Sequence, residues 1–240
     1  MPATTAVETT PCFAVSEMTQ KIIKNFAVIS DSVLLREGTH QRTVSQHKTV
    51  FALADFPEAW PKETGIYALG QFLGDLSLFA KPQIDFRDDC MVISSADSPR
   101  SRTFYRYSDP STIQTTPDKT FPRDNPAVEF TLSDYDLSQL RKHTSQLKLE
   151  TVHITVKDGT VQLSAAKAKD SAAHGYKLDI PKAEVTINDP KFNRKIPFKV
   201  EHLGFLLDGS YKVALSDWHY GYFTNTVVPV SYYVTEQTKD

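Results

Sequence analysis

The stretch Ile84–Asp97, with the sequence IDFRDDCMVISSAD, recurs in outline as Ile154–Lys167, with the sequence ITVKDGTVQLSAAK. Each block alternates apolar and polar residues around a central polar turn, and Lys157-Asp158-Gly159 is a typical hairpin signal. The two blocks align without a gap, pairing Ile84, Arg87, Asp88, Ile93 and Ser94 with Ile154, Lys157, Asp158, Leu163 and Ser164. The same β-hairpin is therefore expected twice in the fold.

The sequence around these hairpins repeats as well. An apolar strand leads into a helix before each hairpin, and a further strand follows it. Residues 16–56 and 196–234 also show a helix followed by strands, so the chain contains about four strand–helix–strands units, two in each domain. One such unit leaves an apolar sheet face uncovered, and pairing two units buries it, which predicts an α+β fold. The expected helices are Glu17–Phe26, Ala68–Phe79, Ser133–Leu147 and Val200–Leu207, and the strands after the hairpins are Arg102–Tyr107 and Tyr176–Ile180.

Two of the predicted helices begin at a serine. Ser16 precedes the first, whose apolar residues Met18, Ile22, Ile23 and Phe26 share one side. Ser133 precedes the third, where Asp136 takes the place of the Glu of a capping box. Leu137, Leu140, Thr144 and Leu147 share a face of that helix. Both patterns predict amphipathic helices that lie on a sheet.

The composition of the chain and its proline-rich stretch predict the domain limits. The predicted organisation is a mobile tail over 1–15, a first domain over 16–108, a connector over 109–126 and a second domain over 127–240. The connector region contains four prolines and little periodicity, which is typical of an extended linker.

The overall composition excludes several classes of protein. About 40% of the 240 residues are hydrophobic and 23% are charged, a balance typical of globular proteins. No apolar run is long enough to span a membrane, and the start of the chain lacks a signal-peptide pattern. The two cysteines, Cys12 and Cys90, are expected to be reduced thiols in a cytosol. Since the net charge is −2, any DNA-binding charge must be confined to one face.

The sequence contains no recognisable catalytic pattern. Its nine glycines form no phosphate-binding loop, and its seven histidines show no metal-ligand spacing. The acidic pair Asp88-Asp89 falls in a predicted hairpin turn, and Asp134 and Asp136 fall in the first turn of a predicted helix, where negative charge suits the helix dipole. We therefore expect a protein that is not an enzyme and that has no metal site or cofactor.

Basic residues lie on the polar sides of three predicted helices. Any solvated helix face can carry lysines, but helices that cover one side of a continuous sheet would join their outer faces into a single surface. Lysines on that surface would attract phosphates without distinguishing sequence. The candidate DNA-facing residues are Lys21, Lys24, Arg141, Lys142 and Lys199.

The order and spacing of short stretches along about 220 residues resemble the sliding clamps of T-even bacteriophages. The similar stretches are Ile23–Ala27, Ile66-Tyr67, Phe72–Gly74, Leu76–Leu78, Ser108–Thr112, Ile154–Lys157, Lys167, Asp170–Ala172, Gly209, Tyr211-Lys212 and Leu215. The sequence departs from that family in a longer N-terminal tail, the composition of its connector and its C-terminal end.

This resemblance implies the DNA-clamp fold of proliferating cell nuclear antigen, in a homotrimeric ring of six similar domains. Sheets would form the outer wall, and helices would line a hole around duplex DNA. The clamp would tether the phage DNA polymerase for processive synthesis, after loading by an ATP-driven clamp loader in the cytoplasm of the infected bacterial host. Late-transcription factors are a further implied partner.

The resemblance also implies two protein-binding surfaces. A hydrophobic tail of a partner would enter a pocket at Ile113, Val228, Pro229, Val230 and Tyr232. Ring closure would pair the edge strands of neighbouring subunits through Arg102, Phe104, Tyr105, Tyr107, Tyr176, Leu178 and Ile180.

Two other classes of protein share parts of this pattern. A structural phage β-protein of the tail or baseplate would have the strands without the basic helix faces. A single-strand-binding module would stack bases on exposed aromatic residues, but most of the aromatic residues here fall inside strand patterns.

Overall fold

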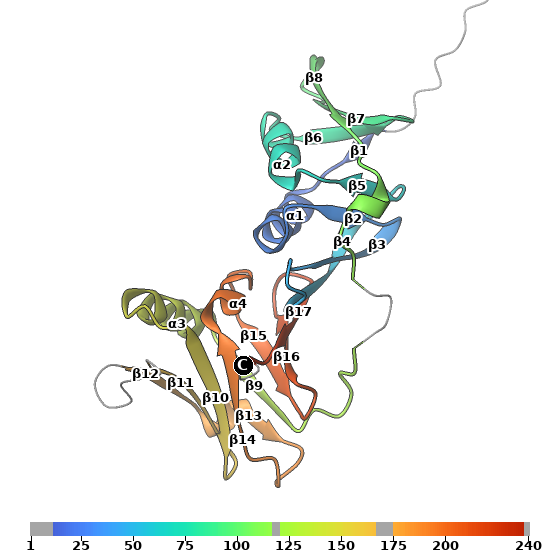
Figure 1. Cartoon of the computed structure of the whole chain (residues 1–240). Coiled ribbons are helices and arrows are strands. Elements are labelled where there is room, and N and C mark those ends of the chain that lie inside the picture. Colours follow the sequence, from blue (N-terminus) through green and yellow to red (C-terminus); the bar gives the residue numbers. More distant parts are fainter. Residues whose placement is uncertain (1–11, 117–120, 167–174, 238–240) are drawn as a thin grey trace, which may run out of the picture. The chain divides into compact units, whose positions relative to one another are not determined.

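The structure is a computed structural model that describes residues 12–116, 121–166 and 175–237 (Figure 1). These residues form two compact units. Unit 1 holds the described residues up to Gln41 together with Phe56–Gln114, and unit 2 holds Arg42–Asp55 together with the described residues from Thr115 onward. The predicted domain limits differ from this division, because Arg42–Asp55 folds with the second half of the chain.

Unit 1 contains a four-stranded antiparallel sheet of order β1-β6-β7-β8 and a small sheet of β2 and β5. Helices α1 and α2 pack against each other beside these sheets (Figure 1). The elements are β1 (Phe13–Ala14), α1 (Glu17–Ile29), β2 (Val33–Leu35), β5 (Thr64–Ile66), α2 (Leu69–Ser77), β6 (Pro82–Phe86), β7 (Cys90–Ser95), β8 (Ser98–Arg106) and the short 3-10 helix η1 (Pro110–Thr112).

Unit 2 contains a four-stranded antiparallel sheet of order β12-β11-β10-β14 and most of a seven-stranded sheet of order β13-β9-β15-β16-β17-β4-β3. Helices α3 and α4 pack against each other. The elements are β9 (Val128–Leu132), α3 (Asp134–Gln146), β10 (Thr151–Lys157), β11 (Thr160–Ala166), β12 (Gly175–Ile180), η2 (Lys182–Glu184), β13 (Val185–Ile187), β14 (Arg194–Lys199), α4 (Val200–Gly204), β15 (Tyr211–Leu215), β16 (Tyr220–Asn225) and β17 (Val230–Thr235).

Two strands early in the chain, β3 (Gly38–Val44) and β4 (Val50–Trp60), cross the division between the units. The first half of β4 pairs with β17, with Ala54 opposite Val230 and Val50 opposite Val234. This antiparallel ladder is the reason that Arg42–Asp55 belongs to unit 2.

The repeated hairpin predicted from the sequence is confirmed in its register. Ile84 pairs with Ile93 between β6 and β7, and Ile154 pairs with Leu163 between β10 and β11. The two residues that pair across the first hairpin therefore occupy the same positions as the two that pair across the second. In the second copy Asp158 and Gly159 have φ values of +48° and +73°, the mirror-image turn that suits the twist of two-residue hairpins.

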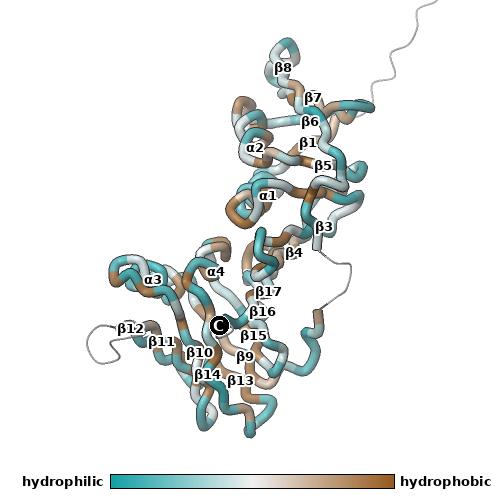
Figure 2. The backbone as a smooth tube through the Cα atoms, in the orientation of Figure 1, coloured by the Kyte–Doolittle hydropathy of each residue, from teal (hydrophilic) through white to brown (hydrophobic). Residues whose placement is uncertain are grey.

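The serine caps of α1 and α3 are confirmed. The Oγ of Ser16 accepts the backbone N–H of Thr19, and the Oγ of Ser133 accepts the backbone N–H of Asp136. The expected capping box differs in one bond, because the Ser133 hydroxyl also donates to the Asp136 carboxylate at 2.6 Å. Figure 2 shows the mixture of hydrophobic and hydrophilic residues along both helices. The fourth helix is shorter than predicted and ends at Gly204.

Each unit has its own core. In unit 1 the ring of Trp60 is fully buried, and its centroid lies 5.1 Å from that of Phe13 and 5.3 Å from that of Phe86. In unit 2 the ring centroid of Phe198 on β14 lies 6.0 Å from that of Phe223 on β16, which joins the two sheets. Burial of such aromatic rings contributes about 1.5–3 kcal/mol each to folding.

Replacing the cap of α3 tests how far this local bond stabilises unit 2. Ser133→Ala removes the acceptor of the Asp136 N–H and should lower the free energy of unfolding by about 1 kcal/mol in urea titrations. Ser138→Ala, at an exposed position on the same helix, is the matched control and should leave stability within about 0.5 kcal/mol. Equal losses from both variants would contradict the role of the cap.

Candidate nucleic-acid interface

Helix α1 presents a narrow exposed stripe opposite its buried side. Its buried residues include Ile22, Ile23 and Phe26, whereas Lys21 and Lys24 are exposed. Glu17 and Val28 continue the stripe at helical spacing. The two lysines named from the sequence are therefore available to solvent, and their contact with DNA stays a prediction.

Helix α3 has an exposed stripe of the same kind, but its two basic residues differ in environment. Lys142 is exposed. The side chain of Arg141 is only 25% exposed, and its guanidinium donates to the carbonyls of Leu203 and Leu206 at 2.9 and 2.5 Å and to Asp208 at 2.6 Å. Arg141 therefore fastens α3 to the segment that includes and follows α4, a structural role that the helical spacing did not reveal.

The other two helices carry less positive charge. The exposed residues of α2 are Gly70, Gln71, Gly74 and Ser77, none of which is basic. Lys199, just before α4, is exposed, and its Nζ lies 3.7 Å from Glu201. His202 on α4 is 5% exposed and packs inward.

Two exposed lysines lie just past helix ends and were missed in the sequence. Lys81 follows α2, and Lys148 follows α3 with a φ of +49°. Basic residues after a helix C-terminus are favoured by the helix dipole, and this preference could have identified them. Both are additional candidates for phosphate contact.

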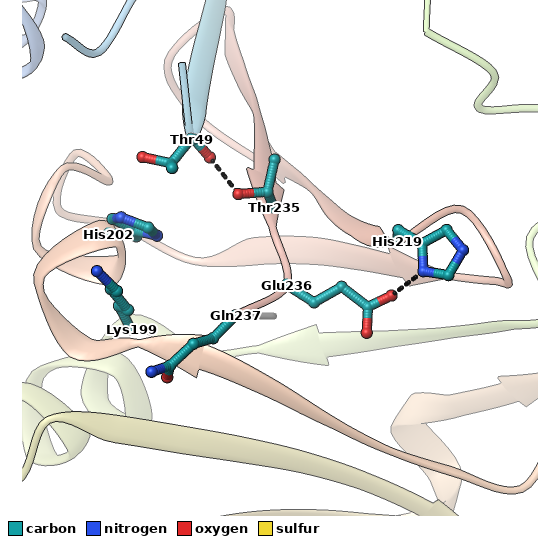
Figure 3. Close-up of a pocket in the computed structure, with 7 residues that line it drawn as sticks. All are labelled: Thr49, Lys199, His202, His219, Thr235, Glu236 and Gln237. Atoms are coloured by element: carbon teal, nitrogen blue, oxygen red, sulfur yellow. Dashed lines mark hydrogen bonds and ion pairs between the residues drawn. The ribbon is translucent and has the colours of Figure 1, made fainter. Parts of the chain in front are cut away.

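A pocket of about 420 Å³ in unit 2 lies beside Lys199 (Figure 3). Lys199 and His202 line one side, and His219 with Glu236 line the other, where the His219 Nδ1 lies 2.9 Å from the Glu236 carboxylate. Arg194 holds the same carboxylate with bonds of 3.1 and 3.0 Å. Since the acidic group here is already paired, the arrangement is a structural charge cluster. Among the described residues no group of three or more His, Cys, Asp and Glu side chains is arranged to hold a metal ion.

The buried imidazole of His202 makes the stability of unit 2 depend on pH. Burial lowers its pKa below 6.5, and its Nδ1 has no hydrogen-bond partner. The unfolded chain therefore binds this proton more readily, so the stability that the neutral ring provides is complete above pH 6.5 and is lost as the pH falls below it.

His202→Gln should reduce the loss of stability between about pH 6.5 and pH 5, measured as urea midpoints at several pH values. The substitution removes the imidazole and therefore its contribution to the pH dependence. Ser138→Ala, at an exposed position of unit 2, introduces and removes no titrating group and should leave the pH dependence unchanged. An identical pH profile for the His202 variant and the unsubstituted chain would contradict the assignment.

Most of the side chains named for the partner-tail pocket are buried, and the pocket stays a prediction. Val228, Val230 and Tyr232 are 2%, 3% and 0% exposed and form part of the unit 2 core, where the Tyr232 hydroxyl accepts the N–H of Leu207. Ile113 is 5% exposed and belongs to unit 1. Pro229 is exposed, but its carbonyl accepts the N–H of Asp55.

The predicted subunit-interface strands lie at sheet edges. β8 ends the first four-stranded sheet and β12 ends the second, so each has one side without a strand partner within the described chain. Phe104 on β8 is 58% exposed, and Arg102 is exposed. On β12, Tyr176 stacks on His143 of α3 with ring centroids 4.6 Å apart, and Leu178 is half-buried.

Three of the side chains named for this interface face their own unit. Tyr105 is buried, and its hydroxyl donates to the carbonyl of Ala68. Ile180 is 5% exposed. The Tyr107 hydroxyl donates to the carbonyl of Arg87, and Lys62 lies over the Tyr107 ring at 4.5 Å. These residues contribute to an edge through their main chain rather than through their side chains.

Solved structures share this architecture over nearly the whole chain. The proliferating cell nuclear antigen of Entamoeba histolytica superposes with a TM-score of 0.69 at 14% identity, covering 92% of this chain and 95% of that one. The structure described as the C-terminal region of FEN-1 bound to A. fulgidus PCNA gives a TM-score of 0.71 at 11% identity, covering 95% of this chain and 98% of that one. The fold is that of the DNA clamps.

Three curated proteins named sliding clamp extend this likeness to the sequence. The protein of Escherichia phage RB69 is 30% identical over 203 residues, covering 83% of this chain and 86% of the relative. The chain belongs to the sliding clamps of T4-like bacteriophages.

The proteins of Vibrio phage KVP40 and Enterobacteria phage T4 are each 29% identical, and each match covers 83% of this chain. The search against family models gave no match. The protein functions as a sliding clamp for DNA polymerase processivity, and the alternative of a structural tail or baseplate protein is not favoured.

Proposed function

We propose that three copies of this chain close into a ring of six similar domains, with the helices toward a central hole and the sheets outside. The observation that supports this most directly is the pair of open edges at β8 and β12, which occupy corresponding places after the repeated hairpins. Edge strands that end a sheet invite pairing with another chain, and a head-to-tail contact between two different edges generates a ring when the rotation between subunits closes.

The residues around these edges suit such a contact. Phe104 and Leu78 in unit 1 are 58% and 67% exposed, and Tyr135 at the start of α3 is 70% exposed. α2 packs against β8, and α3 packs against β12, so apolar groups flank both edges. Exposed apolar side chains beside an open strand edge favour protein association over a free surface.

Ring formation is tested by the molar mass in solution. Light scattering should give about 81 kDa, three times the 27.0 kDa of one chain. Phe104→Asp places a charge at the proposed contact and should shift the mass toward one chain, because the charge loses water on assembly. Val227→Asp, at an aliphatic position that is 78% exposed, is the control and should leave the mass unchanged. A single-chain mass at micromolar concentration would contradict the ring.

In this ring, duplex DNA is held by enclosure rather than by tight contacts. Lys21, Lys24, Lys142 and Lys199 would supply weak attraction to phosphates, which carries no sequence preference and permits sliding. Arg141 would add positive potential while it fastens α3. A clamp of this kind needs no catalysis, so we propose that the chain is not an enzyme.

Charge reversal on the helices tests the DNA-facing surface. Lys24→Glu and Lys142→Glu should each reduce clamp-dependent processive synthesis several-fold and increase its salt sensitivity, because each change occurs three times per ring. Lys212→Glu is the matched control: Lys212 is exposed on β15, next to the buried Tyr211 and Val213 and thus on the opposite sheet face. An equal effect of all three substitutions would contradict the helical surface.

The partners follow from this mechanism. Binding to the clamp makes rebinding of the DNA polymerase to its template intramolecular, which raises the effective concentration of the enzyme. One solved relative is a clamp bound to the C-terminal region of FEN-1, which supports a peptide tail as the tether. A closed ring must be opened to admit DNA, so a clamp loader is a required partner. We also propose late-transcription factors as partners, and the cytoplasm of the infected host as the location.

A further inference from the structure

A row of aromatic side chains crosses the seven-stranded sheet of unit 2. Tyr222 on β16 pairs with Tyr233 on β17, and Tyr233 pairs with Phe51 on β4. Directly paired residues in a sheet share one face. The neighbouring row of Phe223, Tyr232 and Ala52 points to the opposite face, into the core. The aromatic row therefore lies on the face of the sheet that points away from the core.

The connector places one aromatic ring onto this row. The ring centroid of Phe121 lies 4.8 Å from that of Phe51, 5.0 Å from that of Tyr233 and 5.8 Å from that of Tyr220. Phe51 and Tyr233 are 8% and 2% exposed, whereas Phe121 is only half-buried. We define the four residues Phe51, Tyr220, Tyr222 and Tyr233 as the aromatic cradle.

The cradle also binds the main chain and side chain that follow Phe121. The Tyr220 hydroxyl donates to the carbonyl of Pro122, and the guanidinium of Arg123 donates to the Tyr222 hydroxyl at 3.4 Å. Three consecutive connector residues thus contact the surface in three different ways. Phe121 fills a ring-sized apolar site, the carbonyl of Pro122 accepts from a hydroxyl, and Arg123 donates to a hydroxyl. This is the geometry of a receptor for a short peptide with an aromatic residue and a basic residue two positions later.

We propose that Phe121 is an intramolecular competitor that fills the cradle until a polymerase-borne peptide of the same chemistry displaces it. This inference rests on the proposed tethering function and adds the site and its resident occupant. A tethered segment competes at a high effective concentration, so the apparent affinity for an outside peptide falls by the fraction of time that the cradle is open. Removing the Phe121 ring should therefore strengthen peptide binding.

The probe is a fluorescein-labelled peptide with the sequence of Thr115–Pro126, TTPDKTFPRDNP, whose chemistry matches the cradle by construction. The full-length Phe121→Ala clamp should bind this peptide about tenfold more tightly than the unsubstituted clamp in fluorescence anisotropy. A peptide with Ala in place of its Phe should not bind. Since Phe121 is half-buried on the surface, the variant should keep its fold, which circular dichroism and molar mass would verify.

Two further variants locate the effect. Tyr220→Phe, combined with Phe121→Ala, keeps the ring but removes the hydroxyl that donates to the peptide carbonyl, and it should weaken peptide binding several-fold. Val227→Ala, at an exposed position outside the cradle, should bind the peptide as the unsubstituted chain does. Equal peptide affinity of the unsubstituted and Phe121→Ala clamps would overturn the competitor role, and so would equal binding of the Phe and Ala peptides.

An experiment with the cognate polymerase distinguishes a failure of this inference from a failure of the proposed function. Displacement of the labelled peptide by the polymerase supports the assignment of the cradle to the polymerase tail. If the peptide binds but the polymerase fails to displace it while clamp-dependent processive synthesis is intact, the inference is overturned and the tethering function stands. If processive synthesis does not depend on the clamp at all, the proposed function itself has failed.

Discussion

The pairing of the first half of β4 with β17 is the contact on which the second unit depends. It joins residues that lie far apart in the sequence, Val50–Ala54 and Val230–Val234, in one antiparallel ladder. Without it, the edge of β17 would be open and the row that ends in Phe51 would be incomplete. The second half of the same strand carries Phe56 and Trp60 into the core of unit 1. One strand of eleven residues therefore serves both cores.

Local signals in the sequence predicted much of the fold. The serine caps, the mirror-image turn at Asp158-Gly159 and the equal registers of the two hairpins all follow from residues within a few positions of one another. The pattern of the repeated unit was enough to predict strands at Arg102–Tyr107 and Tyr176–Ile180, whereas their place at sheet edges was implied by the family resemblance. These features could be predicted because their determinants are contiguous in the chain.

The site residues were predicted less well, because their environment depends on distant contacts. Helical spacing identified Lys24 and Lys142 as exposed, but it could not show that the carbonyls after α4 hold Arg141 or that His202 is buried. The contacts of Phe121 could not be predicted from the sequence for the same reason. In the sequence it is one residue in a proline-rich connector, and only the ladder of β16, β17 and β4 creates a surface that binds it.

The uncharged outer side of α2 affects how a ring of this kind would move. Its exposed residues are Gly70, Gln71, Gly74 and Ser77, which offer neither charge nor bulk to a phosphate backbone. A continuous belt of cations would hold the duplex in deep, regularly spaced energy wells, and each step along the axis would then be slow. Interrupting the belt in every first domain with a helix that presents no cation would make those wells shallow. In the proposed ring the friction against one-dimensional diffusion would then fall while the duplex stayed enclosed, so residence on DNA and mobility along it would be set by different parts of the chain.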